Sequence, residues 1–110
     1  MSVSVLIMTL NEETNLPACL ASLDWCDDIV VLDSFSDDNT VAIAKTAGAR
    51  VYQHLYETED RQRMYGLTEI KFRHDWVYTP DADEITPPDL RDEMLAIAAD
   101  SERPEVFFKA

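Results

Sequence analysis

Two aspartates separated by one residue, Asp81 and Asp83, are the side chains in this sequence best placed to do chemistry. They directly follow an apolar run at 76–79 that is closed by a proline. Alternate residues of an extended segment point the same way, so both carboxylates can face one ligand. A third aspartate, Asp33, ends a second apolar run at 29–32. If both runs are strands of one parallel sheet, the three carboxylates share an edge of that sheet.

Carboxylates held close together repel one another unless a cation lies between them. Mg²⁺ and Mn²⁺ prefer oxygen ligands, and Mg²⁺ usually takes one or two carboxylates and leaves positions for water and phosphate. An isolated D-x-D is by itself often a solvated loop. Its place after a predicted strand, together with the Asp33 loop, favours a site for Mn²⁺ or Mg²⁺ that also binds a phosphate ligand.

The composition excludes several other classes. The chain has 110 residues, 22 acidic and 9 basic, and a net charge of -13, which rules out nucleic acid as a partner by default. Its two glycines, Gly48 and Gly66, exclude a P-loop and a dinucleotide fingerprint. No apolar run approaches the roughly 20 residues of a membrane span. Cys19 and Cys26 form no metal or redox motif, so we expect reduced thiols and a cytoplasmic protein.

The elements that must position these residues alternate along the chain. Apolar, β-branched runs predict five strands, and stripes of apolar residues at helical spacing predict four helices between them. This order predicts an α/β fold: a mostly parallel sheet flanked by helices, within one domain over 1–110. The polar segments 9–13, 33–40 and 81–84 then converge at the carboxyl ends of the strands, where such sheets bind ligands.

Two helices carry specific expectations. The helix from Asp60 to about residue 72 is predicted to bury the side bearing Met64, Leu67 and Lys71. The last helix is predicted to bury Leu90, Met94, Ile97 and Ala98. Two arginines, Arg61 and Arg63, either pair with nearby acids on an exposed helix face or contact a pyrophosphate, and both interpretations stay open.

Three segments resemble the glycosyltransferase family 2 enzymes, and most closely the branch that builds bacterial lipopolysaccharide core sugars. They read VSVLIMTLNEE at 3–13, IVVLDSFSDDNT at 29–40 and DWVYTPDADE at 75–84. The resemblance covers essentially the whole chain and implies a GT-A fold that binds a nucleotide-diphosphate sugar, commonly a UDP-sugar. It implies a nucleotide site composed of Thr9, Asn11, Glu12, Asp33, Asp81 and Arg63. Asp83 would ligate the metal directly, with Asp81 beside it.

The resemblance also implies an inverting, metal-dependent transfer of the sugar to a saccharide or lipid-linked acceptor hydroxyl. Such enzymes usually exceed 200 residues, and their general base lies in the second half. We therefore expect 1–110 to be the donor-binding half, with the acceptor half and the catalytic base beyond residue 110, and with little turnover of its own. A truncated strand at 106–108 would favour self-association. A location at the inner membrane surface is also compatible with this family.

Two alternatives remain. The first is a nucleotide-binding or scaffold module without catalysis. The second is a response-regulator receiver domain, which has a similar length and an acidic metal site. A receiver domain needs an aspartate after its third strand, where this chain has Gln53 and His54.

Overall fold

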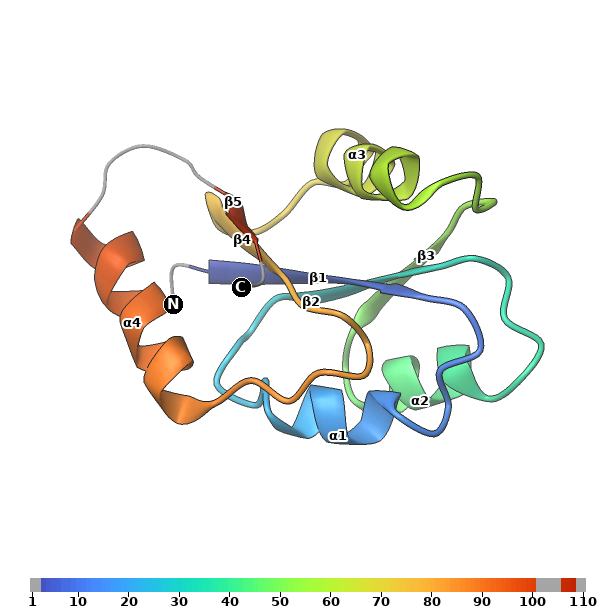
Figure 1. The fold of residues 1–110 in the computed structure, drawn as a ribbon, viewed down its shortest axis with the longest axis horizontal. Coiled ribbons are helices and arrows are strands. Elements are labelled where there is room, and N and C mark those ends of the chain that lie inside the picture. The colour runs from blue at the N-terminus through green and yellow to red at the C-terminus, as the bar shows by residue number, and fades with distance from the viewer. Residues whose placement is uncertain (1–2, 101–105, 109–110) are drawn as a thin grey trace.

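Five parallel strands form one sheet in the order β3-β2-β1-β4-β5 (Figure 1). The computed structural model describes residues 3–100 and 106–108. The strands are β1 Val3–Thr9, β2 Ile29–Asp33, β3 Arg50–Gln53, β4 Trp76–Thr79 and β5 Val106–Phe108. The helices are α1 Leu16–Ala21, α2 Thr40–Thr46, α3 Glu59–Glu69 and α4 Pro88–Asp100. The predicted α/β fold with a parallel sheet flanked by helices is confirmed.

Helices cover both faces of the sheet, with α3 on one face and α1, α2 and α4 on the other (Figure 1). The strand residues alternate accordingly, because successive side chains point to opposite faces. Val5 and Ile7 belong to the larger core cluster, together with Leu16 and Ala44 from the helices. Leu6 belongs to the smaller cluster beneath α3. The continuous apolar sequence of β1 therefore reflects a central strand that is buried on both faces.

The buried face of α3 differs in part from the predicted one: Leu67 packs against the smaller core cluster as predicted, but Met64 does not. Met64 is 61% exposed, and the buried residues are Gln62 and Gly66. A Cβ on Gly66 would lie 2.8 Å from Leu6 Cδ2, so the glycine allows the helix to approach the sheet closely. Hydrophobic periodicity could not find Gln62 and Gly66, because one carries a hydrogen-bonded amide and the other has no side chain.

The last helix follows its prediction with one exception. Met94 and Ala98 are buried in the larger core cluster, and Leu90 packs against it. Ile97, predicted to be buried with them, is 43% exposed. The predicted self-association through 106–108 stays a prediction, because the structure describes this strand by its backbone pairing alone. Across the described part of the chain, no helix is long and apolar enough to span a bilayer.

The topology creates one ligand-binding edge. β1 pairs with β2 on one side and with β4 on the other, so the chain order reverses at β1. Crossover loops leave in opposite directions at such a point and open a crevice at the carboxyl ends of the strands. The loops that follow β1, β2 and β4 all begin at this edge.

Candidate nucleotide-binding site

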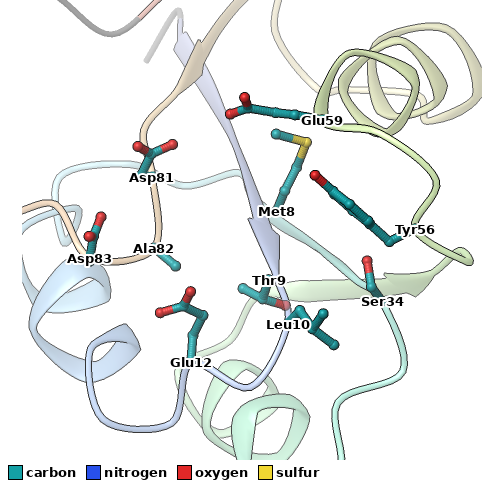
Figure 2. A pocket seen from close by; sticks show the side chains of 10 residues that line it. All are labelled: Met8, Thr9, Leu10, Glu12, Ser34, Tyr56, Glu59, Asp81, Ala82 and Asp83. Carbon is teal, nitrogen blue, oxygen red and sulfur yellow. The ribbon is translucent and has the colours of Figure 1, made fainter.

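A pocket of about 490 Å³ lies at this edge (Figure 2). It is formed by the ends of β1 and β2, the loops after β3 and β4, and the first turn of α3. Its lining residues are Met8, Thr9, Leu10, Glu12, Ser34, Tyr56, Glu59, Asp81, Ala82 and Asp83. Figure 2 shows Asp81, Asp83 and Glu12 on one side, with Leu10 and Tyr56 opposite them. The pocket therefore offers an acidic wall and a partly apolar wall to one ligand.

The loop after β4 presents the two aspartates as the sequence predicts. Ala82, between them, is buried in the larger core cluster, while its two neighbours line the pocket. The loop is closed by two hydrogen bonds: the Asp81 amide donates to Glu84 Oε1 at 2.7 Å, and the Glu84 amide donates to the Asp81 carbonyl at 3.0 Å. The Cys19 thiol of α1 also donates to the Asp81 carbonyl at 3.6 Å. The core thus holds the loop in place from beneath.

The two aspartates fit a divalent cation that is shared with a phosphate ligand. No group of three or more His, Cys, Asp or Glu side chains in the described part of the chain is arranged to hold a metal alone. Hard cations such as Mg²⁺ and Mn²⁺ bind oxygen, and Mg²⁺ commonly uses one or two carboxylates plus phosphate oxygens. Asp81 and Asp83 supply that ligand set if the remaining positions go to a ligand and water.

Behind the opposite wall, Asp33 holds the ends of the first two strands together. Its carboxylate is fully buried and accepts hydrogen bonds from Thr9 Oγ1 at 2.7 Å, Ser36 Oγ at 2.6 Å and Gln53 Nε2 at 3.3 Å. The Ser36 amide donates a fourth bond at 2.8 Å. Burial raises the pKa of Asp33, but the hydrogen bonds from Ser36, Thr9 and Gln53 outweigh it, and the net pKa is lowered.

Asp33 is thus ionised and saturated by donors of its own chain. It does not line the pocket, and the nucleotide contact that the resemblance implies for Asp33 stays a prediction. Thr9, by contrast, lines the pocket directly.

Asn11 links the loops that follow β1 and β2. Its backbone has a positive φ of 55°, a conformation that asparagine tolerates better than most residues. The Asn11 amide donates to Ser36 Oγ at 2.8 Å, and the Asp37 amide donates to Asn11 Oδ1 at 2.8 Å. Asn11 therefore shapes the edge of the site without lining the pocket.

Glu12 reaches the pocket from a fixed backbone. Its amide donates to Thr40 Oγ1 at 2.9 Å, and Thr40 in turn donates through both its hydroxyl and its amide to Asp38. The hydrogen bond from the Thr40 hydroxyl is the largest influence that lowers the pKa of Asp38. Asp38 also accepts from the Glu13 amide at 3.2 Å, so two adjacent amides are bound to the second loop. The backbone of Glu12 is thus held in place, and its side chain points toward the pocket (Figure 2).

Both arginines form ion pairs with nearby acidic residues, which is the first of the two interpretations left open above. Arg63 lies 3.2 Å from Glu59 and 3.6 Å from Asp60, and Arg61 lies 3.2 Å from Glu57. Neither arginine lines the pocket. The diphosphate contact that the resemblance implies for Arg63 stays a prediction.

Several lining residues were not predicted from the sequence. Tyr56 lies in the loop after β3 and Glu59 is the first residue of α3, in a segment without a recognisable motif. Ser34 belongs to a motif segment but was not singled out. Leu10 also lines the pocket, next to the predicted Thr9. The available signal for Tyr56 is its position after the predicted third strand, because such sheets bind ligands beyond the carboxyl ends of their strands.

Comparison with known proteins decides the family. The family model described as Glycosyl transferase family 2 matches residues 4–108. The chain belongs to glycosyl transferase family 2. This membership confirms the resemblance and shows that the receiver-domain alternative is wrong.

Curated relatives of this family 2 chain agree. A glycosyltransferase of Rickettsia typhi is 36% identical over 98 residues, which cover 88% of this chain and 33% of the relative. The lipopolysaccharide core biosynthesis glycosyltransferase LpsC of Rhizobium meliloti is 32% identical over 105 residues, 90% of this chain and 38% of LpsC. The chain therefore spans about a third of the length of these relatives.

Two solved structures of one synthase share the fold of this chain. Glucosyl-3-phosphoglycerate synthase from Mycobacterium tuberculosis, in complex with UDP, superposes with a TM-score of 0.71 at 26% identity. That match covers 92% of this chain and 41% of the synthase. The same synthase with Mn²⁺, UDP and glucosyl-3-phosphoglycerate gives a TM-score of 0.69 at 27% identity, over 89% and 39% of the two chains.

Proposed function

We propose that this chain is the donor-binding part of a glycosyltransferase and that its pocket binds the diphosphate and nucleoside of a nucleotide sugar. The observation that carries the proposal is the pocket itself. Asp81 and Asp83 after β4 line the same cavity as Thr9 and Glu12 after β1, at the point where the strand order reverses. Similar structures that contain UDP and Mn²⁺ support it.

The acidic wall is proposed to face the diphosphate. Two carboxylates in a pocket would repel a diphosphate unless a cation lay between them. We assign Asp83 as the direct ligand of Mn²⁺ or Mg²⁺ and Asp81 as its neighbour toward the ribose. When bound, the ion supplies Lewis-acid neutralisation of the charge on the leaving diphosphate.

The nucleoside is proposed to lie against the wall formed by the ends of β1 and β2. Thr9 contacts the nucleoside directly there. Asn11 and Asp33 set the shape of this wall from behind, and Glu12 closes the side nearest the aspartates. We expect the sugar to lie beyond the diphosphate, on the side away from the nucleoside.

The transfer reaction completes the proposal. An acceptor hydroxyl, from a saccharide or a lipid-linked saccharide, attacks the anomeric carbon, and the bond to the diphosphate oxygen breaks with inversion. A carboxylate general base removes the hydroxyl proton. We place that base beyond residue 110, so the isolated chain is expected to bind donor and transfer sugar poorly. The similarity to LpsC supports a role in lipopolysaccharide or surface polysaccharide synthesis. We further propose a cytoplasmic location at the inner membrane surface.

The test is calorimetric titration of UDP into the chain with and without Mn²⁺. Wild type is expected to bind UDP at least tenfold more tightly with Mn²⁺ than without it, and Asp83→Ala is expected to lose that gain. Asp24→Ala is the matched control, because it removes the same charge from an exposed position outside the pocket. A folded wild type that binds no UDP under either condition would favour a scaffold without nucleotide binding.

A further inference from the structure

A buried glutamine lies directly behind the pocket. Gln62 of α3 is only 1% exposed, and its amide makes three hydrogen bonds. Nε2 donates to Ser34 Oγ at 3.0 Å and to the His54 carbonyl at 3.2 Å. Oε1 lies 3.0 Å from His54 Nδ1. Gln62 therefore connects the loop after β3 to a residue that lines the pocket.

The orientation of this amide is fixed by chemistry. A backbone carbonyl can only accept a hydrogen bond, so the Gln62 nitrogen must face the His54 carbonyl. The amide oxygen then faces the His54 ring, and Nδ1 must carry the proton that it accepts. The ring itself is held by stacking on Tyr65, with centroids 3.7 Å apart and planes 15° apart.

The fixed amide determines what the Ser34 hydroxyl can do. Ser34 Oγ accepts from Gln62, and among the described residues its own proton has no acceptor. Ser34 lines the pocket, so this proton is available to a ligand there. The neighbouring Thr9 has the opposite polarity, because its proton is donated to Asp33. The wall thus presents a donor at Ser34 beside an acceptor at Thr9.

We propose that Gln62 is a positioning residue for donor binding: it holds the Ser34 hydroxyl as a hydrogen-bond donor to an acceptor oxygen of the nucleoside. The inference rests on the proposed function, since it assigns a hydrogen-bonding role to one wall of the same pocket. Gln62 never touches the nucleotide and acts through Ser34 alone.

A double-mutant cycle of UDP binding in the presence of Mn²⁺ tests this. Gln62→Glu keeps the shape of the side chain but replaces the donor by an acceptor, so the Ser34 proton turns toward residue 62 and away from the pocket. We expect UDP to bind about tenfold more weakly to Gln62→Glu and about fivefold more weakly to Ser34→Ala, in the range of one lost hydrogen bond. The double variant should be no weaker than about tenfold, because both changes remove the same donor.

Gln62→Met provides a second variant if the buried carboxylate prevents folding. It should weaken UDP binding about threefold, and it should also shift the ¹⁵N resonance of His54 Nδ1, which loses its acceptor. Met64→Ala on the exposed side of α3 is the control and should bind UDP as wild type does. The inference would be overturned if the two losses of UDP affinity multiplied in the double variant. It would also be overturned if folded Gln62 variants bound UDP with wild-type affinity. Either result would leave the proposed function standing. Absence of UDP binding by wild type would overturn both.

Discussion

The hydroxyl of Thr9 donates a 2.7 Å hydrogen bond to Asp33 Oδ1, and the two residues are register partners at the ends of β1 and β2. One of them lines the pocket, and the other is fully buried behind it. The hydrogen bond therefore has two effects: it stabilises the pairing of β1 with β2, and it leaves the Thr9 hydroxyl as an acceptor in the pocket wall. Substitutions of Asp33 should lower the free energy of unfolding directly and should affect nucleotide affinity only indirectly.

Asp33→Asn should lower the free energy of unfolding by about 2 kcal/mol, because its amide group would face two donors, the Ser36 amide and Gln53 Nε2. Urea unfolding followed by circular dichroism measures the change. Asp37→Asn, an exposed aspartate in the same loop, is the control and should leave the free energy within about 0.5 kcal/mol of wild type. Equal stability of the two variants would contradict the assignment of Asp33 as a buried, hydrogen-bonded carboxylate.

The free energy of unfolding should fall in acid because two buried aspartates, Asp28 and Asp33, have lowered pKa values. Burial raises the pKa of Asp28, but bonds from the Arg73 amide, Ser4 and Arg50 outweigh it, and the net pKa is lowered, as it is for Asp33. A lowered folded pKa stabilises the fold above the unfolded value, about 4 for aspartate, and that stabilisation is lost as pH falls through the folded value. The free energy of unfolding, measured by urea unfolding at several pH values, should therefore decrease as the pH is lowered from 7 to 3.

The contribution of Asp28 can be isolated from this decline. Asp28→Asn should be less stable at pH 7 and should show a shallower acid decline than wild type. Asp24→Asn, at an exposed position, should keep the wild-type slope. Because Asp28 lies outside the pocket lining, a folded Asp28→Asn should also bind UDP as wild type does.

Gly66→Val should lower the free energy of unfolding by about 2 kcal/mol or more. Even a Cβ at this position would lie 2.8 Å from Leu6 Cδ2 and 3.3 Å from Leu32 Cδ2, so either α3 or these buried leucine side chains must shift. Thr68→Val places the same side chain on the exposed side of α3 and should cost less than about 1 kcal/mol. Thermal or urea unfolding of the two variants compares them, and similar losses would argue against close packing of α3.

Arg63→Met should change the affinity for UDP less than twofold, since its guanidinium is paired with Glu59 and Asp60 and does not line the pocket. The same calorimetric titration measures it. Arg61→Met, on the more exposed of the two arginines, is the matched control. A loss of tenfold or more for Arg63→Met alone would show that Arg63 reaches the diphosphate.

Both thiols should be slow to react in the folded chain. Burial raises the pKa of Cys19 to about 12 and that of Cys26 to about 11, so the reactive thiolate is scarce at pH 8. Disulfide exchange with a chromogenic reagent should therefore be at least about a hundredfold slower than for an exposed thiol. Both thiols should react rapidly in denaturant. A rapid reaction of one thiol per native chain would contradict the burial of these side chains.

The sequence predicted the fold well where its signal was apolar periodicity or strand order. The place of Asp81 and Asp83 followed from strand order alone, and both line the pocket. The failures have a common physical cause. Gln62 is buried because hydrogen bonds satisfy its amide, and no hydrophobic pattern reports such bonds. In the same way, the burial of Asp33 depends on donors from two other strands, Thr9 of β1 and Gln53 of β3, which only the folded chain brings together.

The order of the strands also bears on how the pocket comes into being during folding. β1 pairs Val3 with Trp76, so the two halves of the binding edge are far apart in the chain. Forming β1 and β2 completes the nucleoside wall, but the aspartates arrive only when β4 adds to the other side of β1. Contacts of such long sequence separation form late and slowly. Nucleotide affinity should therefore appear as one of the last events of refolding, after helical structure and most of the sheet. A ribosome-bound chain that ends before β4 would lack both aspartates of the pocket.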